Sequence, residues 1–152
     1  MSLAELEDLG RLFHDAGMDN LDISPLERAV ARLAEAWERW QRHRDDDQLR
    51  DGLIQRFEFT YELSHKMLRR YLESVAATPE EVARMPFPDL IRTASEHGLL
   101  MQDWSAWRRY REMRNKTSHT YDERVAAEVV SGIEDFLADA QTPCRNLKQH
   151  LN

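Results

Sequence analysis

Apolar residues recur along this chain at intervals of three and four, and the strict alternation typical of half-exposed strands is absent. The spacing predicts four main helices, over residues 24–44, 48–75, 104–114 and 122–142, with shorter helical turns after residue 78 and over residues 87–97. Glycine and proline, five of each, fall at the boundaries of these segments. The fold class expected is therefore all-α, an up-down four-helix bundle with short additional helices.

The predicted helix over residues 48–75 has the widest apolar surface of the set. One stripe carries Leu49, Leu53, Phe57, Thr60, Ser64, Met67, Tyr71 and Val75, and a second edge carries Ile54, Tyr61, Leu68 and Leu72. A stripe that is wider than one partner needs is expected at the centre of a bundle or in an interface.

The two ends of the chain are expected to lie outside the bundle of residues 24–141. Residues 1–23 are predicted to be an extension with an amphipathic helix, because apolar side chains recur from Leu3 to Phe13. Thr142 and Pro143 are expected to close the last helix and to leave residues 142–152 as a loose tail.

Polar residues mark where the helices begin. Aspartates precede three of them, at positions 45–47, 103 and 122, where a carboxylate accepts from the free backbone N–H groups. The segments at residues 24–27 and 78–81 have the spacing of capping boxes.

Composition excludes several classes of protein. The 152 residues include no apolar run of about 18, so no transmembrane span is expected. The acidic N-terminus does not resemble a secretory signal, and the single Cys144 excludes a disulfide framework and a cysteine-based zinc site. The histidines lack metal-ligand spacing, so neither metal nor cofactor is predicted, and the expected location is the cytoplasm.

Charge is distributed unevenly. Against a net charge of −7, Arg108, Arg109, Arg111, Arg114 and Lys116 are opposed within their segment only by Glu112. Arginines interleaved with tryptophan and tyrosine are suited to bind the phosphates and bases of RNA or a nucleotide. The alternative is a solvated helix face with surface ion pairs.

The end of this basic segment places three reactive side chains close together in sequence. Arg114 can hold a phosphate, His119 can move a proton near neutral pH, and Tyr121 can donate a hydrogen bond or carry a modification. The alternative for His119 is a capping or surface residue in a turn.

These residues resemble a known family. Arg114-x4-His119-x-Tyr121 matches the Arg-x4-His-x-Tyr signature of HEPN domains. The segment Gln55 to Leu63 (QRFEFTYEL), with Arg114-Asn115 and Thr117 to Glu123, is similar to the branch called nucleotidyltransferase substrate-binding proteins. One departure is Ser64-His65-Lys66, where that branch often has alanine and tryptophan before the lysine.

The resemblance implies a helical bundle that forms an antiparallel homodimer, with the signatures of the two protomers facing one shared cleft. It implies a metal-independent RNase, with Arg114 and His119 catalytic, that acts beside a minimal nucleotidyltransferase on a separate chain. That partner would adenylylate Tyr121 and silence the RNase, as in the toxin–antitoxin systems of the family.

Three functions stay open from the sequence: an RNase toxin, a non-catalytic subunit that binds substrate for a nucleotidyltransferase, and a structural helical dimer. The chain lacks a Gly-Ser pair followed by Asp-x-Asp and is therefore not expected to be the nucleotidyltransferase itself. Asn115, Glu58 and Glu62 are expected to support the site. For the two glutamates the alternatives are helix-surface pairs or orientation of Arg114 or His119 from a neighbouring helix.

Overall fold

A computed structural model describes residues 21–151, and over them the chain is all-helical. Its elements are α2 (Ser24–Arg42), α3 (Asp47–Val75), α4 (Pro79–Ala83), α5 (Phe87–Glu96), α6 (Trp104–Lys116), the 3-10 turn η1 (Thr117–His119), α7 (Glu123–Ser131) and α8 (Ile133–Leu151). The helix predicted within residues 3–13 lies outside the described residues. Over residues 21–151, no helix is both long and apolar enough to cross a bilayer.

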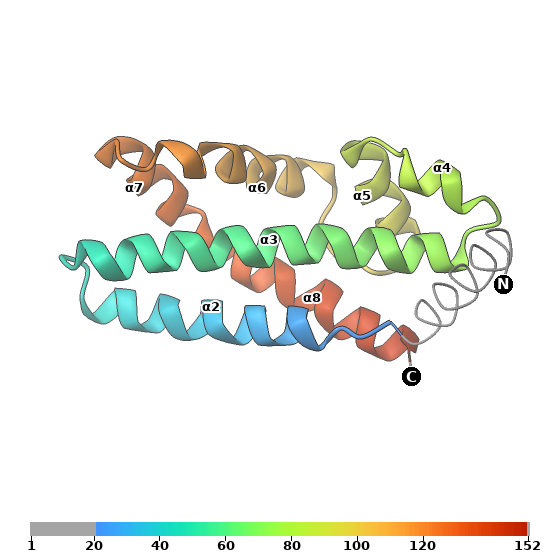
Figure 1. Cartoon of the computed structure of the whole chain (residues 1–152), viewed down its shortest axis with the longest axis horizontal. Coiled ribbons are helices and arrows are strands. Elements are labelled where there is room, and N and C mark those ends of the chain that lie inside the picture. Colours follow the sequence, from blue (N-terminus) through green and yellow to red (C-terminus); the bar gives the residue numbers. More distant parts are fainter. Residues whose placement is uncertain (1–20, 152) are drawn as a thin grey trace, which may run out of the picture.

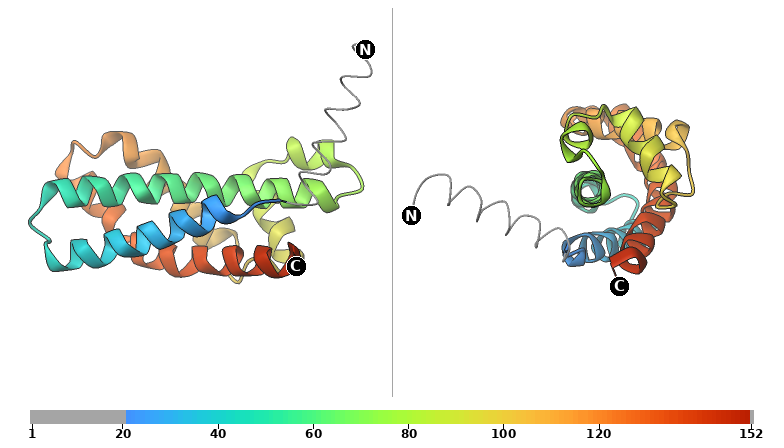
Figure 2. Two further views of the ribbon diagram at one scale, coloured as in Figure 1. Left: turned by 60° about the horizontal axis from the view of Figure 1, so that its bottom comes forward. Right: turned by 90° about the vertical axis from the view of Figure 1, so that its right-hand side faces the viewer.

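The helix α3 forms the axis of the bundle. It packs against α2, α4, α5, α6, α7 and α8, as its wide apolar surface predicted. Seen end-on, the other helices curve around α3 and leave one side of it without a neighbouring helix (Figures 1 and 2). Along α3 the exposed residues recur in one stripe that includes Asp51, Gln55, Phe59, Glu62 and Lys66.

Aromatic side chains form the middle of the core. Phe57 of α3 meets Phe136 of α8 with ring centroids 4.9 Å apart and nearly perpendicular planes. Tyr110 and Trp107 of α6 pack edge-on against the same Phe136 and are almost fully buried. Edge-to-face packing of this kind adds to the stabilisation that the buried apolar area supplies. The core therefore ties α3, α6 and α8 together and fixes the position of the α6 C-terminus.

The aspartate caps predicted from the sequence are confirmed. Asp46 accepts from the backbone N–H of Gln48, Asp103 from that of Ser105, and Asp122 from that of Arg124. The predicted capping boxes are wrong. The backbone N–H of Ser24 donates to Asp22, the N-cap of α2 is Ile23, and neither Ser24 nor Thr78 makes a side-chain cap bond.

The predicted last helix over residues 122–142 is wrong at both its middle and its end. It breaks at Gly132, which ends α7 and against which the end of the Met113 side chain packs. α8 then continues through Pro143 to Leu151, and the segment from Cys144 is helical rather than loose.

Tertiary contacts explain why Pro143 does not end α8. Proline removes one backbone hydrogen bond from a helix interior. Pro143 and Leu147 are buried, however, and the Asn146 amide donates to the carbonyls of Gly98 and Leu99 at 3.1 and 3.3 Å. Burial and these bonds offset the loss.

Candidate functional site

Arg114 lies in the last turn of α6 and is held by two carboxylates of α3. Its Nε and Nη2 lie 2.8 and 2.7 Å from the same oxygen of Glu62, Oε1. Nη2 is also 3.4 Å from Oε1 of Glu58. The two glutamates are one helical turn apart on α3, so both reach the same guanidinium. The structure therefore favours orientation of Arg114 across two helices over surface pairing within α3.

Thr117 holds the other side of the guanidinium. Nη1 of Arg114 donates to Oγ1 of Thr117 at 3.1 Å, and this hydroxyl donates to the Arg114 carbonyl oxygen at 2.7 Å. Thr117 is 8% exposed and begins η1. The role of Thr117 in holding Arg114 was not predicted from the sequence. A threonine three residues after an arginine at a helix end was the available signal, because Thr hydroxyls often bond the carbonyl of residue i−3.

The turn η1 presents His119 and Tyr121 to solvent. The Thr120 hydroxyl donates to the Thr117 carbonyl at 3.2 Å, and the Asp122 N–H donates to the His119 carbonyl at 3.1 Å. Nδ1 of His119 lies 3.5 Å from the hydroxyl oxygen of Tyr121, with ring centroids 6.0 Å apart. Tyr121 is 82% exposed. Both side chains are therefore accessible to a macromolecular substrate or a modifying enzyme.

The basic residues around Arg114 do not gather on one surface. Arg109 pairs with Asp135 of α8 at 2.8 Å, and Lys116 pairs with Glu128 of α7 at 3.1 Å. The other contacts are Arg108 with Glu112 within α6 and Arg111 over the ring of Phe87 at 5.7 Å. Arg109 and Lys116 lie on a different face of α6 from Arg111 and Arg114, which are three residues apart. Part of the local positive charge is thus paired with acids of other helices.

Asn115 is exposed at the end of α6, and its side chain makes no hydrogen bond with the residues that the structure describes. Its predicted supporting role stays a prediction. Within residues 21–151, no three His, Cys, Asp or Glu side chains are grouped as metal ligands would be.

His65 occupies the position where the resemblance suggested an aromatic side chain. Its ring packs edge-on against Phe87 with centroids 4.6 Å apart, and Nε2 lies 3.3 Å from Nη2 of Arg69. Burial, together with the charge of Arg69, lowers the pKa of His65 to about 4. Because a guanidinium only donates, Nε2 accepts this bond in the neutral ring. His65 acts as a neutral aromatic packing residue near neutral pH.

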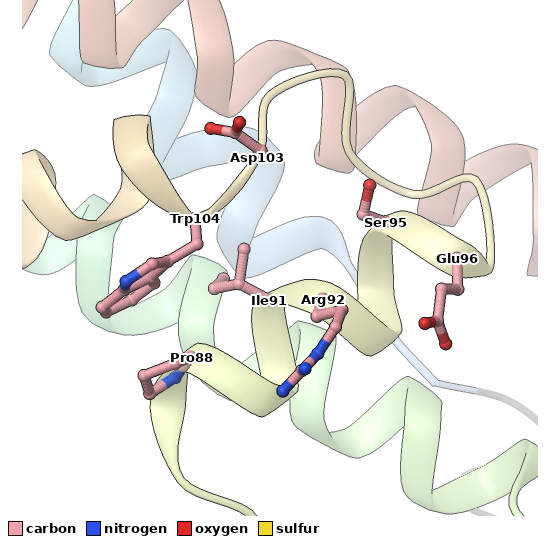
Figure 3. Close-up of a pocket in the computed structure, with 7 residues that line it drawn as sticks. All are labelled: Pro88, Ile91, Arg92, Ser95, Glu96, Asp103 and Trp104. Atoms are coloured by element: carbon pink, nitrogen blue, oxygen red, sulfur yellow. The ribbon is translucent and has the colours of Figure 1, made fainter.

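Several pockets in the described part of the chain lie away from the signature. One of about 430 Å³, shown in Figure 3, lies between α5 and the start of α6, and Pro88, Ile91 and Trp104 supply apolar side chains to its lining. Another of about 380 Å³ has Trp37 and Trp40 of α2 on its lining. Both tryptophans also pack against the core. Neither pocket contains Arg114, His119 or Tyr121.

Comparisons with known proteins agree with one another. The family model described as nucleotidyltransferase substrate binding protein like matches residues 21–149. A protein of Haemophilus influenzae named probable ribonuclease HepT is 40% identical over 125 residues, which are 82% of this chain and 85% of that protein. A solved structure from Haemophilus influenzae, described as the fold of a substrate binding domain of a nucleotidyltransferase, superposes with a TM-score of 0.79 at 35% identity and covers 84% of this chain and 99% of that one.

Proposed function

This chain belongs to the nucleotidyltransferase substrate binding protein like family of HEPN proteins, and from that premise we propose that it is a metal-independent endoribonuclease regulated by a separate nucleotidyltransferase. The observation that carries the proposal is the exposed His119–Tyr121 pair, one turn beyond an arginine that three side chains hold in place. The relative named probable ribonuclease HepT supports the same activity.

RNA can be cleaved without metal because its 2′-hydroxyl serves as an internal nucleophile. In the proposed reaction His119 accepts the proton of the 2′-hydroxyl as its oxygen bonds to phosphorus, because imidazole can both take up and release a proton. The bond from phosphorus to the 5′-oxygen breaks, and a second proton-transfer group protonates the leaving 5′-oxygen. Arg114 stabilises the negative charge that develops on the phosphate, from an orientation set by Glu62 and Thr117. DNA has no 2′-hydroxyl and is not a substrate for this step.

The proposed site is completed by an antiparallel homodimer, in which two signatures share one cleft. One protomer places a single His119 on its surface, so a second copy would supply the second proton-transfer group.

Tyr121 is the proposed point of control. Its hydroxyl is accessible, and an adenylyl group attached to it would place a charged phosphate and a bulky base next to His119. The group would exclude RNA by occupancy and by repulsion of the backbone. A minimal nucleotidyltransferase on another chain would transfer it from ATP to the Tyr121 oxygen with release of pyrophosphate, as in a toxin–antitoxin pair.

RNA incubated with the purified protein in EDTA tests the proposal. The wild-type protein is expected to cut RNA and to leave DNA of the same sequence intact, and His119→Ala is expected to abolish cleavage. His97→Ala, which removes another exposed imidazole, serves as the matched control and should retain the activity. Equal cleavage by His119→Ala and wild type would show that the proposal is wrong.

A second candidate is a non-catalytic subunit that presents substrate to a nucleotidyltransferase, which the description of the solved relative favours. It predicts that the chain co-purifies with a small nucleotidyltransferase and has no RNase activity. It also predicts that the partner's transfer to its acceptor slows when this chain is omitted.

A further inference from the structure

A groove of about 450 Å³ lies between α2 and α3, which run side by side (Figure 1), and its lining does not include Arg114, Glu58 or Glu62. Its polar lining comes mainly from Arg28, Arg32, Arg56 and Gln55, and no carboxylate lines it. A volume of this size is in the range of small-molecule sites. The groove is a concentration of positive charge on a chain whose net charge is −7.

The arginines of the groove are available to a ligand. Nη1 of Arg56 donates to the carbonyl oxygen of Arg32 at 2.9 Å, which anchors Arg56 across the groove. Among the residues that the structure describes, no carboxylate forms an ion pair with these three guanidinium groups. Asp22 lies near Arg28, but its carboxylate already accepts from the Ser24 N–H at 2.9 Å.

An aromatic ring completes the groove. Phe59 lies on its lining and is 56% exposed, which is unusual for a phenylalanine in a helix that packs on six others. Leu63 and Ala29 provide apolar surface beside it. Guanidinium groups bind phosphate through planar pairs of N–H donors, and an exposed ring stacks on any base.

From these contacts we propose that the α2–α3 groove binds nucleoside phosphates, with Arg28, Arg32 and Arg56 on the phosphate and Phe59 on the base. The ligand is either a free nucleotide or one unit of single-stranded RNA. If the proposed RNase activity is correct, the groove is a binding subsite for the same strand. Phe59 follows Glu58 of the Arg114 contact and lies on an adjoining face of α3.

A second copy of the chain fits this groove less well than an anion does. A twofold axis through the groove would bring the same surface of each protomer together. The arginines of one copy would then face those of the other, and like charges at short distance repel. Charge complementarity therefore favours a phosphate over a second copy related by a twofold axis through the groove.

Fluorescence anisotropy with a short labelled oligouridylate tests the proposal, with every protein carrying His119→Ala so that no probe is cut. Arg28→Gln/Arg32→Gln is expected to bind about tenfold more weakly, and its slope of log affinity against log salt should fall by about 1.4. Phe59→Ala is expected to weaken binding about tenfold, and Phe59→Tyr should restore it. A labelled AMP measured in parallel separates a free-nucleotide site, which binds both probes, from an RNA subsite, which prefers the oligonucleotide.

The matched control is Arg84→Gln/Arg145→Gln, which removes the same charge from exposed positions outside the groove. It should bind like the parent. Equal weakening by both double variants, or parent-like binding by Arg28→Gln/Arg32→Gln, would overturn the proposal. So would a Phe59→Ala variant that loses self-association in size-exclusion chromatography and keeps its affinity for the probe, because the groove would then be a protein interface.

Failure of the groove proposal can be distinguished from failure of the proposed RNase activity. A wild-type protein that cuts no RNA, with groove variants that bind weakly, refutes the RNase and retains the groove. A wild-type protein that cuts RNA, with groove variants that bind the probe normally, supports the RNase and refutes the groove proposal.

Discussion

Two nitrogens of Arg114, Nε and Nη2, converge on one carboxylate oxygen of Glu62, at 2.8 and 2.7 Å. The residues are 52 positions apart in sequence and lie on different helices. Glu62 therefore has two effects on Arg114: it fixes the direction of the guanidinium, and it competes with a phosphate for the same N–H groups. These two effects can be separated by kinetics.

Glu62→Gln is expected to lower kcat for RNA cleavage by roughly tenfold to a hundredfold, because Arg114 loses its fixed orientation. KM should stay level or fall, because the guanidinium no longer faces a competing charge. Steady-state rates on a fluorogenic RNA substrate provide the measurement. Glu58→Gln is the matched control and should have a smaller effect, since Glu58 lies 3.4 Å from Nη2 alone. A Glu62→Gln enzyme with unchanged kcat would contradict a positioning role.

Tyr121→Phe is expected to retain RNA cleavage, because the hydroxyl has no assigned part in proton transfer. The same variant should resist silencing when it is co-expressed with the partner nucleotidyltransferase. Intact-mass spectrometry should show an added adenylyl group on the wild type and none on Tyr121→Phe. Tyr71→Phe, which changes a tyrosine that is 8% exposed, should be modified like the wild type. Modification of Tyr121→Phe at wild-type levels would exclude Tyr121 as the target.

The depressed pKa of His65 predicts a pH dependence of stability. Its pKa is about 4 in the folded chain, against 6.5 for an unperturbed imidazole, so the unfolded chain binds more protons between these values. The contribution of neutral His65 is fully present above pH 6.5 and is lost as the pH falls toward 4. The free energy of unfolding is expected to fall by at most about 3 kcal/mol. Solvent that reaches the half-buried ring screens its charge and makes the loss smaller.

His65→Phe isolates this contribution, because phenylalanine keeps the packing against Phe87 and does not titrate. The free energy of unfolding, from urea titrations at each pH, should fall less steeply for His65→Phe than for wild type between pH 6.5 and 4. His43→Gln changes an exposed histidine and should follow the wild-type curve. Parallel curves for wild type and His65→Phe would show that His65 does not titrate in this range.

The C-terminal half of α8 is predicted to contribute to stability. Leu147 is fully buried, so Leu147→Ala should reduce the free energy of unfolding by about 2–5 kcal/mol through lost apolar burial and a new cavity. Gln149→Ala, at an exposed position of the same helix, should stay within about 0.5 kcal/mol of wild type. Urea denaturation measures both. A neutral Leu147→Ala would mean that the segment after Pro143 is not packed as the structure has it.

Local patterns predicted a large part of this protein. The spacing of apolar residues located the long α3 and its buried positions from Leu53 to Leu72, although Val75, predicted on the same stripe, is 47% exposed. Single aspartates located three helix starts, because period and capping depend on neighbours within a few residues. Patterns of the same length failed where a distant contact decided the outcome. The last helix is interrupted at Gly132, where Met113 of α6 packs against it, and α8 passes Pro143 because Leu147 is buried and Asn146 donates to carbonyls of residues 98 and 99.

The sequence by itself determined the helical class, the uneven charge, and the signature residues Arg114, His119 and Tyr121. Only the tertiary structure decided which charges meet. It placed Glu58 and Glu62 against Arg114 and divided the neighbouring basic residues among acids of α7 and α8. It also brought three arginines and Phe59 of α2 and α3 to one groove. The reason is that a sequence shows only which charged residues are neighbours along the chain, whereas an ion pair depends on how two helices are rotated and packed against each other.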